Sequence, residues 1–170
     1  ENLILAKKDV AEKPTDMLCY KDKLYILGAN NNQIDVYDYN GSEKNPEFER
    51  IQSISTLNDY HAADSAACAM KFSSDGKYLF YSNAGDNSVG VSEINEETGE
   101  LTKKFVLPIS GSYPKDIAVF PDNKHLVSLN HESNTMTFFS VDLANGLLVM
   151  SGKEIKVDQP NCIIFHELES

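Results

Sequence analysis

Cysteine, long apolar runs and positive charge are all scarce in this chain of 170 residues. Its three cysteines are Cys19, Cys68 and Cys162, and no two of them form a C-x-x-C pair. That spacing excludes a zinc knuckle and a dithiol redox motif. Widely spaced single cysteines predict buried free thiols in a reducing compartment, because a free cysteine is among the residues most often found inside a protein.

The apolar runs are only a few residues long, as in residues 162–165, whereas a membrane span needs about 20. There are 15 basic and 26 acidic side chains, which gives a net charge of −11. Nucleic acid and anionic membranes attract clustered Lys and Arg, so neither is an expected partner. The start of the chain does not resemble a signal peptide, and we expect a cytoplasmic protein.

Helical periodicity is nearly absent as well, since no long stretch keeps apolar residues at i, i+3, i+4 and i+7. Short alternating segments rich in aromatic and β-branched residues occur instead, with turn residues between them. Residues 77–83 form one such segment, residues 84–87 form a turn, and residues 88–94 form the next segment. The sequence therefore predicts an all-β fold.

The strand pattern repeats along the chain. Phe120 follows Phe72 at an offset of 48 residues, and Asn130 follows Asn83 at an offset of 47. A repeat of this length with three or four strands per unit is typical of β-propeller blades, which bury their faces on each other. An open β-sandwich would share the short strands but not the repeat.

The repeat predicts three blades, with a partial blade at either end. The expected bounds are about 14–60, 61–113 and 114–159 for the blades, and 1–13 and 160–170 for the partial blades. Propellers close with roughly four to eight blades. We therefore expect either a missing N-terminal half of a longer protein or a second copy of the chain to complete the ring.

Several phrases of the repeat resemble those of one family. Residues 72–89, FSSDGKYLFYSNAGDNSV, resemble the phrase sPDGryLYvsNRGhdSi of the seven-bladed lactonase propellers. Residues 111–117 resemble its gg-x-x-PR-x-f phrase, residues 54–57 its iSTLP stretch, and residues 160–165 its terminal PvCvkF. The resemblance covers nearly the whole chain, in order, and corresponds to the C-terminal half of the family.

The family includes propeller-type 6-phosphogluconolactonases and carboxy-muconate cyclases. The resemblance implies a seven-bladed ring. It also implies hydrolysis of a sugar lactone, such as the 6-phosphogluconolactone of the pentose phosphate pathway, in a central cleft and without a cofactor. Such a reaction needs donors or a cation for the developing oxyanion and a base that activates water. A phosphate on the substrate would also favour Arg or Lys.

The chain departs from the family at several of these polar positions. Ala84 stands where the family has the Arg of NRG, and Asp86 where a His usually follows. Lys115 replaces the PR arginine, which keeps the charge but loses the planar fork. A family Glu falls near Ala29 or Asn30. The alternative is therefore a propeller that binds a ligand or a protein without catalysis.

The candidate catalytic residues are Lys115, His131 and Asp86. Lys115 begins an expected inner strand, where it would contact an anionic substrate, and its other interpretation is a solvated lysine. His131 occupies the turn position that is equivalent to Ala84, and it could also be an exposed turn residue. Asp86 is either an acid–base group or a turn former.

The candidate substrate-binding residues are Asn83 and Asn130, which are equivalent in the repeat, and His61 and Asp64, which lie in the longer loop before the central blade. The two asparagines could instead cap turns through side-chain hydrogen bonds. Binding residues often lie on loops of this kind. No metal-ligand spacing, nucleophile elbow or phosphate-binding loop occurs in the sequence.

Overall fold

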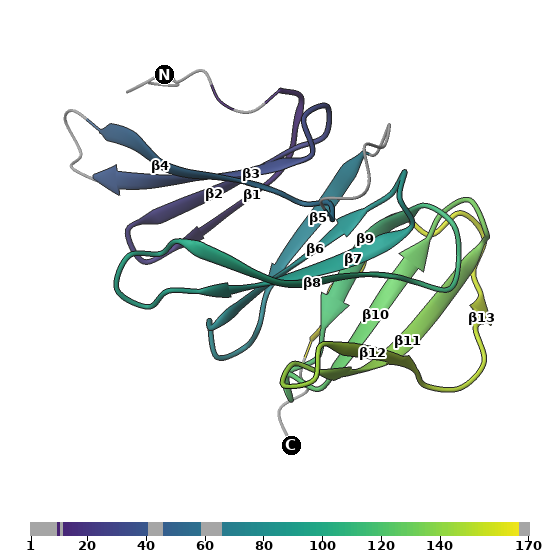
Figure 1. Ribbon diagram of the computed structural model, residues 1–170. Helices are drawn as coiled ribbons and strands as arrows, with labels where there is room; N and C mark the ends of the chain where they lie inside the picture. Colours follow the sequence, from purple (N-terminus) through teal and green to yellow (C-terminus); the bar gives the residue numbers. More distant parts are fainter. Residues whose placement is uncertain (1–9, 11, 41–45, 59–65, 167–170) are drawn as a thin grey trace.

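The computed structural model describes residues 10, 12–40, 46–58 and 66–166, and in them it contains strands and no helix. The strands form three antiparallel sheets that follow one another along the chain (Figure 1). Each sheet is an up-and-down meander, as its strands pair in sequence order. This arrangement confirms the predicted all-β fold and is that of a partial β-propeller.

The first blade pairs four strands, and the second blade repeats this order. The strands of the first blade are β1 (Pro14–Tyr20), β2 (Lys23–Gly28), β3 (Gln33–Asn40) and β4 (Glu47–Ser55). The strands of the second blade are β5 (Ala67–Phe72), β6 (Tyr78–Asn83), β7 (Ser88–Ile94) and β8 (Leu101–Pro108).

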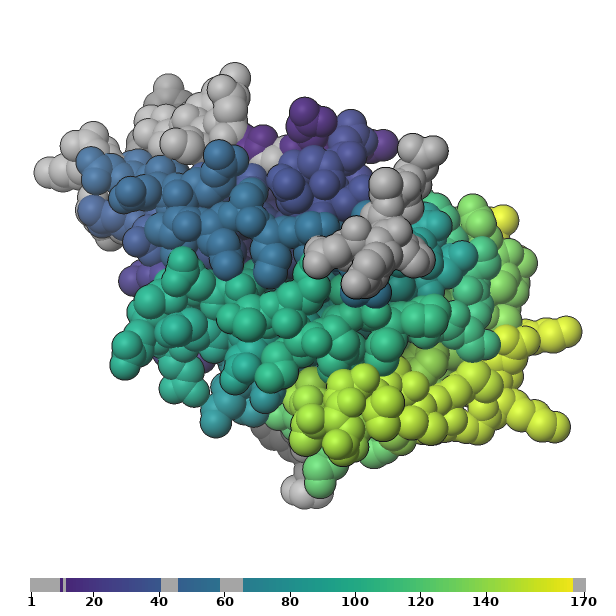
Figure 2. All heavy atoms as spheres, viewed as in Figure 1, coloured from purple at the N-terminus to yellow at the C-terminus, as the bar shows by residue number. Residues whose placement is uncertain are grey.

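The third blade has one additional short strand. Its strands are β9 (Pro114–Val119), β10 (His125–Asn130), β11 (Thr135–Asp142) and β12 (Leu147–Met150), with β13 (Ile155–Lys156) also paired to β11. The three blades pack directly on one another as successive layers (Figure 2).

The blades approach each other most closely along their first strands, β1, β5 and β9, which therefore form the inner edge of the stack. Their outer strands are joined through long side chains. Gln52 on β4 donates to the carbonyl of Leu101 on β8 at 2.9 Å and accepts from its amide at 2.7 Å. Blades that converge at one edge in this way are arranged around a common axis, as in a propeller.

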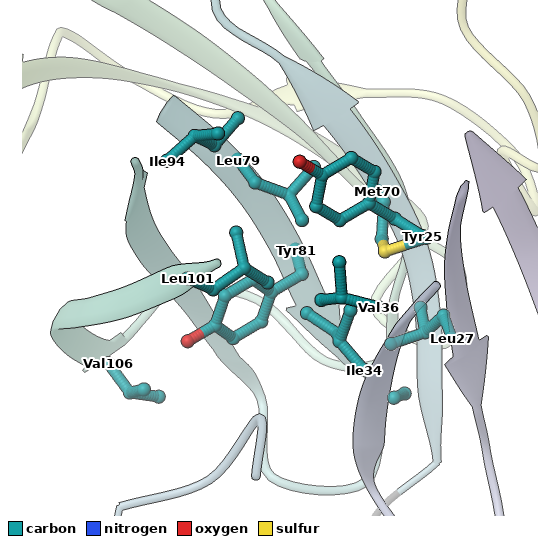
Figure 3. Close-up of a cluster of buried hydrophobic side chains, with 11 residues drawn as sticks. Tyr25, Leu27, Ile34, Val36, Met70, Leu79, Tyr81, Ile94, Leu101 and Val106 are labelled. Carbon is teal, nitrogen blue, oxygen red and sulfur yellow. The ribbon is translucent and has the colours of Figure 1, made fainter. Parts of the chain in front are cut away.

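Two apolar cores fill the spaces between the blades. Figure 3 shows the first core, in which Tyr25, Leu27 and Ile34 of the first blade face Met70 and Tyr81 of the second. The second core lies between the second and third blades. Its buried residues are Ala69, Phe80, Val89, Val91, Ile109, Ile117, Leu126, Phe139 and Val141. The second blade thus buries both of its faces, and the first and third blades each bury the face that is turned toward it.

One glycine is essential to the first core. Gly90 on β7 pairs with Tyr81 on β6, and the Tyr81 ring lies where a side chain at position 90 would be placed. The Tyr81 side chain is fully buried. The absence of a side chain at position 90 therefore makes room for the largest residue type of this core.

The turn between the second and third strand has the same form in all three blades. Each turn has four residues and ends in an asparagine with left-handed backbone: Asn32, Asn87 and Asn134 have φ values of 51°, 51° and 55°. Asparagine tolerates this region better than other residues with a side chain. The predicted turns at 84–87 and 131–134 are confirmed.

A β-bulge also recurs at the same place in the first strand of each blade. The ladder to the second strand slips between Pro14 and Asp16, between Ala67 and Ala69, and at Pro114–Asp116. The extra residues are Thr15, Cys68 and Lys115. A bulge of this kind re-aims a side chain relative to the regular pleat.

The prediction of three buried thiols is wrong. Cys19 and Cys162 are exposed and Cys68 is half-buried. Cys19 lies on the outer face of the first blade, where it lines an open groove, and Cys68 is one of the bulge residues. The strand pattern identified these positions as apolar, but it did not indicate which faces and edges of the sheets are covered.

Candidate functional site

The three bulge residues follow one another along the inner edge of the stack. The Thr15 hydroxyl donates to the carbonyl of Ala67 on the next blade at 2.9 Å. Cys68 in turn lies close enough to Lys115 on the following blade for the ammonium group to affect the thiol. We call the bulges, the residues before them and the adjoining turns the inner rim.

Tyr113 connects most of the candidate residues at this rim. Its amide donates to Asn87 Oδ1 at 2.7 Å, and its carbonyl accepts from the amide of His131 at 2.9 Å. The Tyr113 and His131 rings lie 6.2 Å apart between centroids. Asp86 precedes Asn87 in its turn, and Lys115 is two residues after Tyr113. The structure thus brings Lys115 and His131 close to one residue, and Asp86 lies in the turn that bonds to it through Asn87.

The backbone at this position is strained. Lys13, Tyr113 and Gln159 each precede a proline, and each has a positive φ, of 50°, 60° and 40°. A positive φ is costly for a residue with a side chain, and the following proline further restricts the allowed conformations. Strain of this kind is retained where the surrounding structure holds it, often at functional sites.

The electrostatics of the rim centre on Cys68. Burial is the main cause that raises the pKa of its thiol, and the Lys115 ammonium and a hydrogen bond with Tyr113 partly oppose this. The neighbouring Cys68 and then burial raise the pKa of the Tyr113 hydroxyl. Both groups are therefore neutral hydrogen-bond donors near neutral pH, beside the permanent positive charge of Lys115.

His131 is half-buried and held in one tautomer. Its Nδ1 lies 3.2 Å from the carbonyl oxygen of Pro160. A carbonyl can only accept, so Nδ1 carries the proton and the neutral ring has its lone pair on Nε2. The Nε2 atom is consequently available to accept a proton, as a general base requires.

Asn83 and Asn130 are fully buried, and their amide groups bind to the protein itself. Asn83 Nδ2 donates to the carbonyl of Thr56 at 2.9 Å and to Ser88 Oγ at 3.1 Å. Asn130 Nδ2 donates to the carbonyl of Ser110 at 3.2 Å and to two threonine hydroxyls. These contacts fasten the turns, as the alternative interpretation of the sequence expected.

The structure gives fewer contacts for the remaining candidate site residues. Asp86 is half-buried in the turn between β6 and β7. His61 and Asp64 lie outside the described residues. Across the described ranges, no group of His, Cys, Asp and Glu side chains could hold a metal ion, and no helix is long and apolar enough to cross a membrane.

Sequence reasoning missed Cys68 and Tyr113 as rim residues. Aligning the repeat by its strand register would have placed Cys68 beside Lys115, since both are the second residue of a first strand. The apolar neighbours Ala67 and Ala69 instead made Cys68 look like a core thiol. Nothing in the sequence signals Tyr113 except its position before Pro114.

Stacked four-stranded meanders that converge on a rim of polar side chains place the chain among the β-propellers. Residues 16–165 match the family model described as "Lactonase, 7-bladed beta-propeller", and the chain belongs to this family. A protein of Bacillus subtilis strain 168 named 6-phosphogluconolactonase is 28% identical over 141 residues, which are 83% of this chain and 40% of the relative.

Solved structures agree with the fold. A Bacteroides fragilis protein superposes with a TM-score of 0.80 at 25% identity, over 95% of this chain and 44% of that one. The periplasmic gluconolactonase of Pseudomonas aeruginosa gives a TM-score of 0.79 at 20% identity, over 88% of this chain and 41% of that one. The chain thus spans less than half of the length of each of these three proteins.

Proposed function

We propose that the protein of which this chain forms part hydrolyses a sugar lactone, with 6-phosphogluconolactone as the favoured substrate, in the carbohydrate metabolism of the cytoplasm. The observation that carries the proposal is the grouping of Lys115 and His131 around Tyr113, with Asp86 in the adjoining turn, at the inner rim of a lactonase-family propeller. The name of the Bacillus subtilis relative supports this choice of substrate.

The chemistry follows from the donors and acceptors at the rim. His131, with its proton held on Nδ1, accepts a proton from water at Nε2 as the water attacks the lactone carbonyl. The Lys115 ammonium stabilises the oxyanion that develops on the carbonyl oxygen. The ring oxygen then leaves and takes the proton that His131 Nε2 received from water, which yields the hydroxy acid. Asp86 supplies a second acid–base group on the neighbouring turn.

The test uses the complete protein and two histidines at opposite ends of one strand. His131 follows β10 and His125 begins it, where His125 is exposed and bonded to Asp122. His131→Asn keeps a donor toward Pro160 but has no base, so we expect kcat on 6-phosphogluconolactone to fall by about 10²–10⁴-fold. His125→Asn is the control and should retain full activity. A rate equal to spontaneous hydrolysis in the unmodified protein would reject the proposal.

The second candidate is a propeller that binds its ligand without turnover. It is favoured by Ala29 and Ala84, which are buried and occupy the turn positions equivalent to His131, so that this position offers a base in only one of the three blades. In that case a gluconate-type ligand would raise the melting temperature of the complete protein, while lactone hydrolysis would stay at the spontaneous rate.

In our proposal, the partner that completes the ring packs on the outer face of the first blade. Met17, Leu24 and Tyr39 line an apolar groove of about 670 Å³ there, and Met17 is 58% exposed. Their equivalents in the second blade, Met70, Leu79 and Ile94, are buried against the first blade. In the third blade the equivalents are Ile117, Leu126 and Val141, which are buried against the second.

The groove therefore has the character of a surface that receives a preceding blade. The occupant in our proposal is a further four-stranded blade of the same polypeptide, since the chain spans 40% of its Bacillus subtilis relative. Cys19 lies in this groove, so its reactivity with an alkylating reagent shows whether the groove is covered. In the complete native protein we expect Cys19 to resist thiol alkylation until urea is added. Rapid native labelling would contradict an occupied groove, and a dimer by mass would point to a second copy of the chain.

A further inference from the structure

We propose that Cys68, Tyr113 and Lys115 together form an oxyanion-binding subsite on the inner rim, which holds the carboxylate or phosphate of a sugar-derived ligand. The inference rests on the proposed function and adds two residues, Cys68 and Tyr113, to the site. It starts from the equivalent bulges on β5 and β9, which place a thiol and an ammonium group on adjacent first strands.

The three groups lie together and differ from their surroundings. The Tyr113 hydroxyl and the Cys68 thiol lie close enough to affect each other's ionisation, and both residues are half-buried. The Lys115 and Lys13 ammonium groups both act on the Cys68 thiol. Two cations thus lie near this point of a chain whose net charge is −11.

Two acids close to the subsite contact other groups of the protein. Asp116 is buried, its Oδ1 lies 3.3 Å from Lys71 Nζ, and its Oδ2 accepts from the amide of Ile163 at 2.9 Å. Glu132 is exposed and contacts the hydroxyl of Ser112 at 3.3 Å. Because no acid forms an ion pair with Lys115 among the described contacts, the ammonium group is left for a ligand anion.

The chemistry of the donors selects the ligand class. An ammonium group only donates hydrogen bonds, and a protonated thiol and a phenol can each donate one as well. Such a set matches a group that only accepts, which describes the oxygens of a carboxylate or a phosphate. The equivalent bulge residue of the first blade, Thr15, donates its hydroxyl proton to the carbonyl of Ala67 and is therefore not part of the subsite.

The experiment measures protection of Cys68 in the complete protein. The thiol is alkylated with iodoacetamide in the presence of 6-phosphogluconate, gluconate, sorbitol 6-phosphate or neutral sorbitol, at constant ionic strength, and labelling is quantified by peptide mass spectrometry. At a ligand concentration ten times its Kd, labelling of Cys68 should slow by about tenfold. Protection by gluconate alone identifies the carboxylate as the bound group, and protection by sorbitol 6-phosphate alone identifies the phosphate.

Two lysine variants make the test specific. Lys115→Met should abolish the protection, whereas Lys21→Met, which removes a lysine that lies over the Tyr20 ring, should leave it intact. Equal labelling rates with all four compounds, or full protection in Lys115→Met, would overturn the proposal. Lactone hydrolysis measured in parallel separates the two hypotheses. Protection of Cys68 without hydrolysis would reject the lactonase proposal and keep the subsite. Hydrolysis without protection would reject the subsite and keep the lactonase proposal.

Discussion

The carboxylate of Asp116 in the third blade accepts a hydrogen bond from the amide of Ile163, which lies beyond that blade, at 2.9 Å. Asp16 in the first blade makes the same contact with the amide of Met70 in the second, at 2.7 Å. The two aspartates are equivalent in the repeat, because each follows a bulge in a first strand. Each carboxylate therefore links a first strand to the segment that follows it around the axis.

Each of these carboxylates also accepts a hydrogen bond from an amide of its own strand. Asp16 Oδ1 accepts from the amide of Met17 at 2.8 Å, and Asp116 Oδ1 accepts from that of Ile117 at 2.9 Å. The second blade has Ala69 at this position. An aspartate in the first and third blades thus accepts from the amide that follows the bulge in its own strand and from an amide of the segment that comes next around the axis.

The first prediction concerns this link. Asp116→Ala should lower the free energy of unfolding of the complete protein by about 2–4 kcal/mol, because two amides lose their acceptor and Lys71 loses its ion pair. Asp116→Asn keeps one carbonyl acceptor and should cost about half as much. Urea unfolding measures both, with the exposed Glu96→Ala as the control. A loss for Asp116→Ala no larger than that of the control would show that the link carries no stability.

The second prediction concerns the space above Gly90. Gly90→Ala should destabilise the complete protein by about 1–3 kcal/mol, since the new methyl group would overlap the buried Tyr81 ring. The check is a double-mutant cycle with Tyr81→Leu, measured by thermal unfolding. If the overlap is the cause, Gly90→Ala costs clearly less in the Tyr81→Leu background, and equal costs in both backgrounds would refute it.

The third prediction is a pH dependence of stability. Burial acts to raise the pKa of Asp75, but hydrogen bonds from the Ser73 hydroxyl and the Lys77 amide outweigh it, so that the pKa is below its ordinary value of 3.8. A lowered folded-state pKa stabilises the fold above the unfolded-state pKa, and this stabilisation is lost as the pH falls through the folded value. The stability difference between Asp75 and Asp75→Asn should shrink on acidification below 3.8, as measured by urea unfolding from pH 7 to pH 3. A difference that does not change with pH would contradict this.

The fourth prediction uses the Cys68 thiol. Burial raises its pKa above the ordinary value of 9.0, against the lowering effect of Lys115 and Tyr113. Alkylation requires the thiolate, so the rate for Cys68 should rise at a higher pH than that for a cysteine peptide. Lys115→Met removes a lowering influence and should move the rise to a still higher pH. The groups that act on this thiol are Lys115, Tyr113, Asp116 and Lys13, and an unchanged profile in Lys115→Met would exclude the proposed contact.

The repeat made the fold predictable, and the inner rim was predictable only in part. Alternating segments that end in Asn83 and Asn130 fixed the strands and the turns, because the pleat has a period of two and turns need particular residues. Lys115 was selected through a family phrase, and His131 through its equivalence to Ala84 in the repeat. Cys68 and Tyr113 were not, since strand periodicity does not indicate where a ladder slips, and two residues that are 45 positions apart meet only when blades stack.

The bulge in each first strand has a consequence for how such proteins diversify. Thr15, Cys68 and Lys115 are the extra residues of their ladders, and they are not members of the apolar cores between the blades. A codon change at one of these positions alters the chemistry at the hub while the sheets keep their register. Mutation can thus explore new ligands one blade at a time, at little expense to the scaffold.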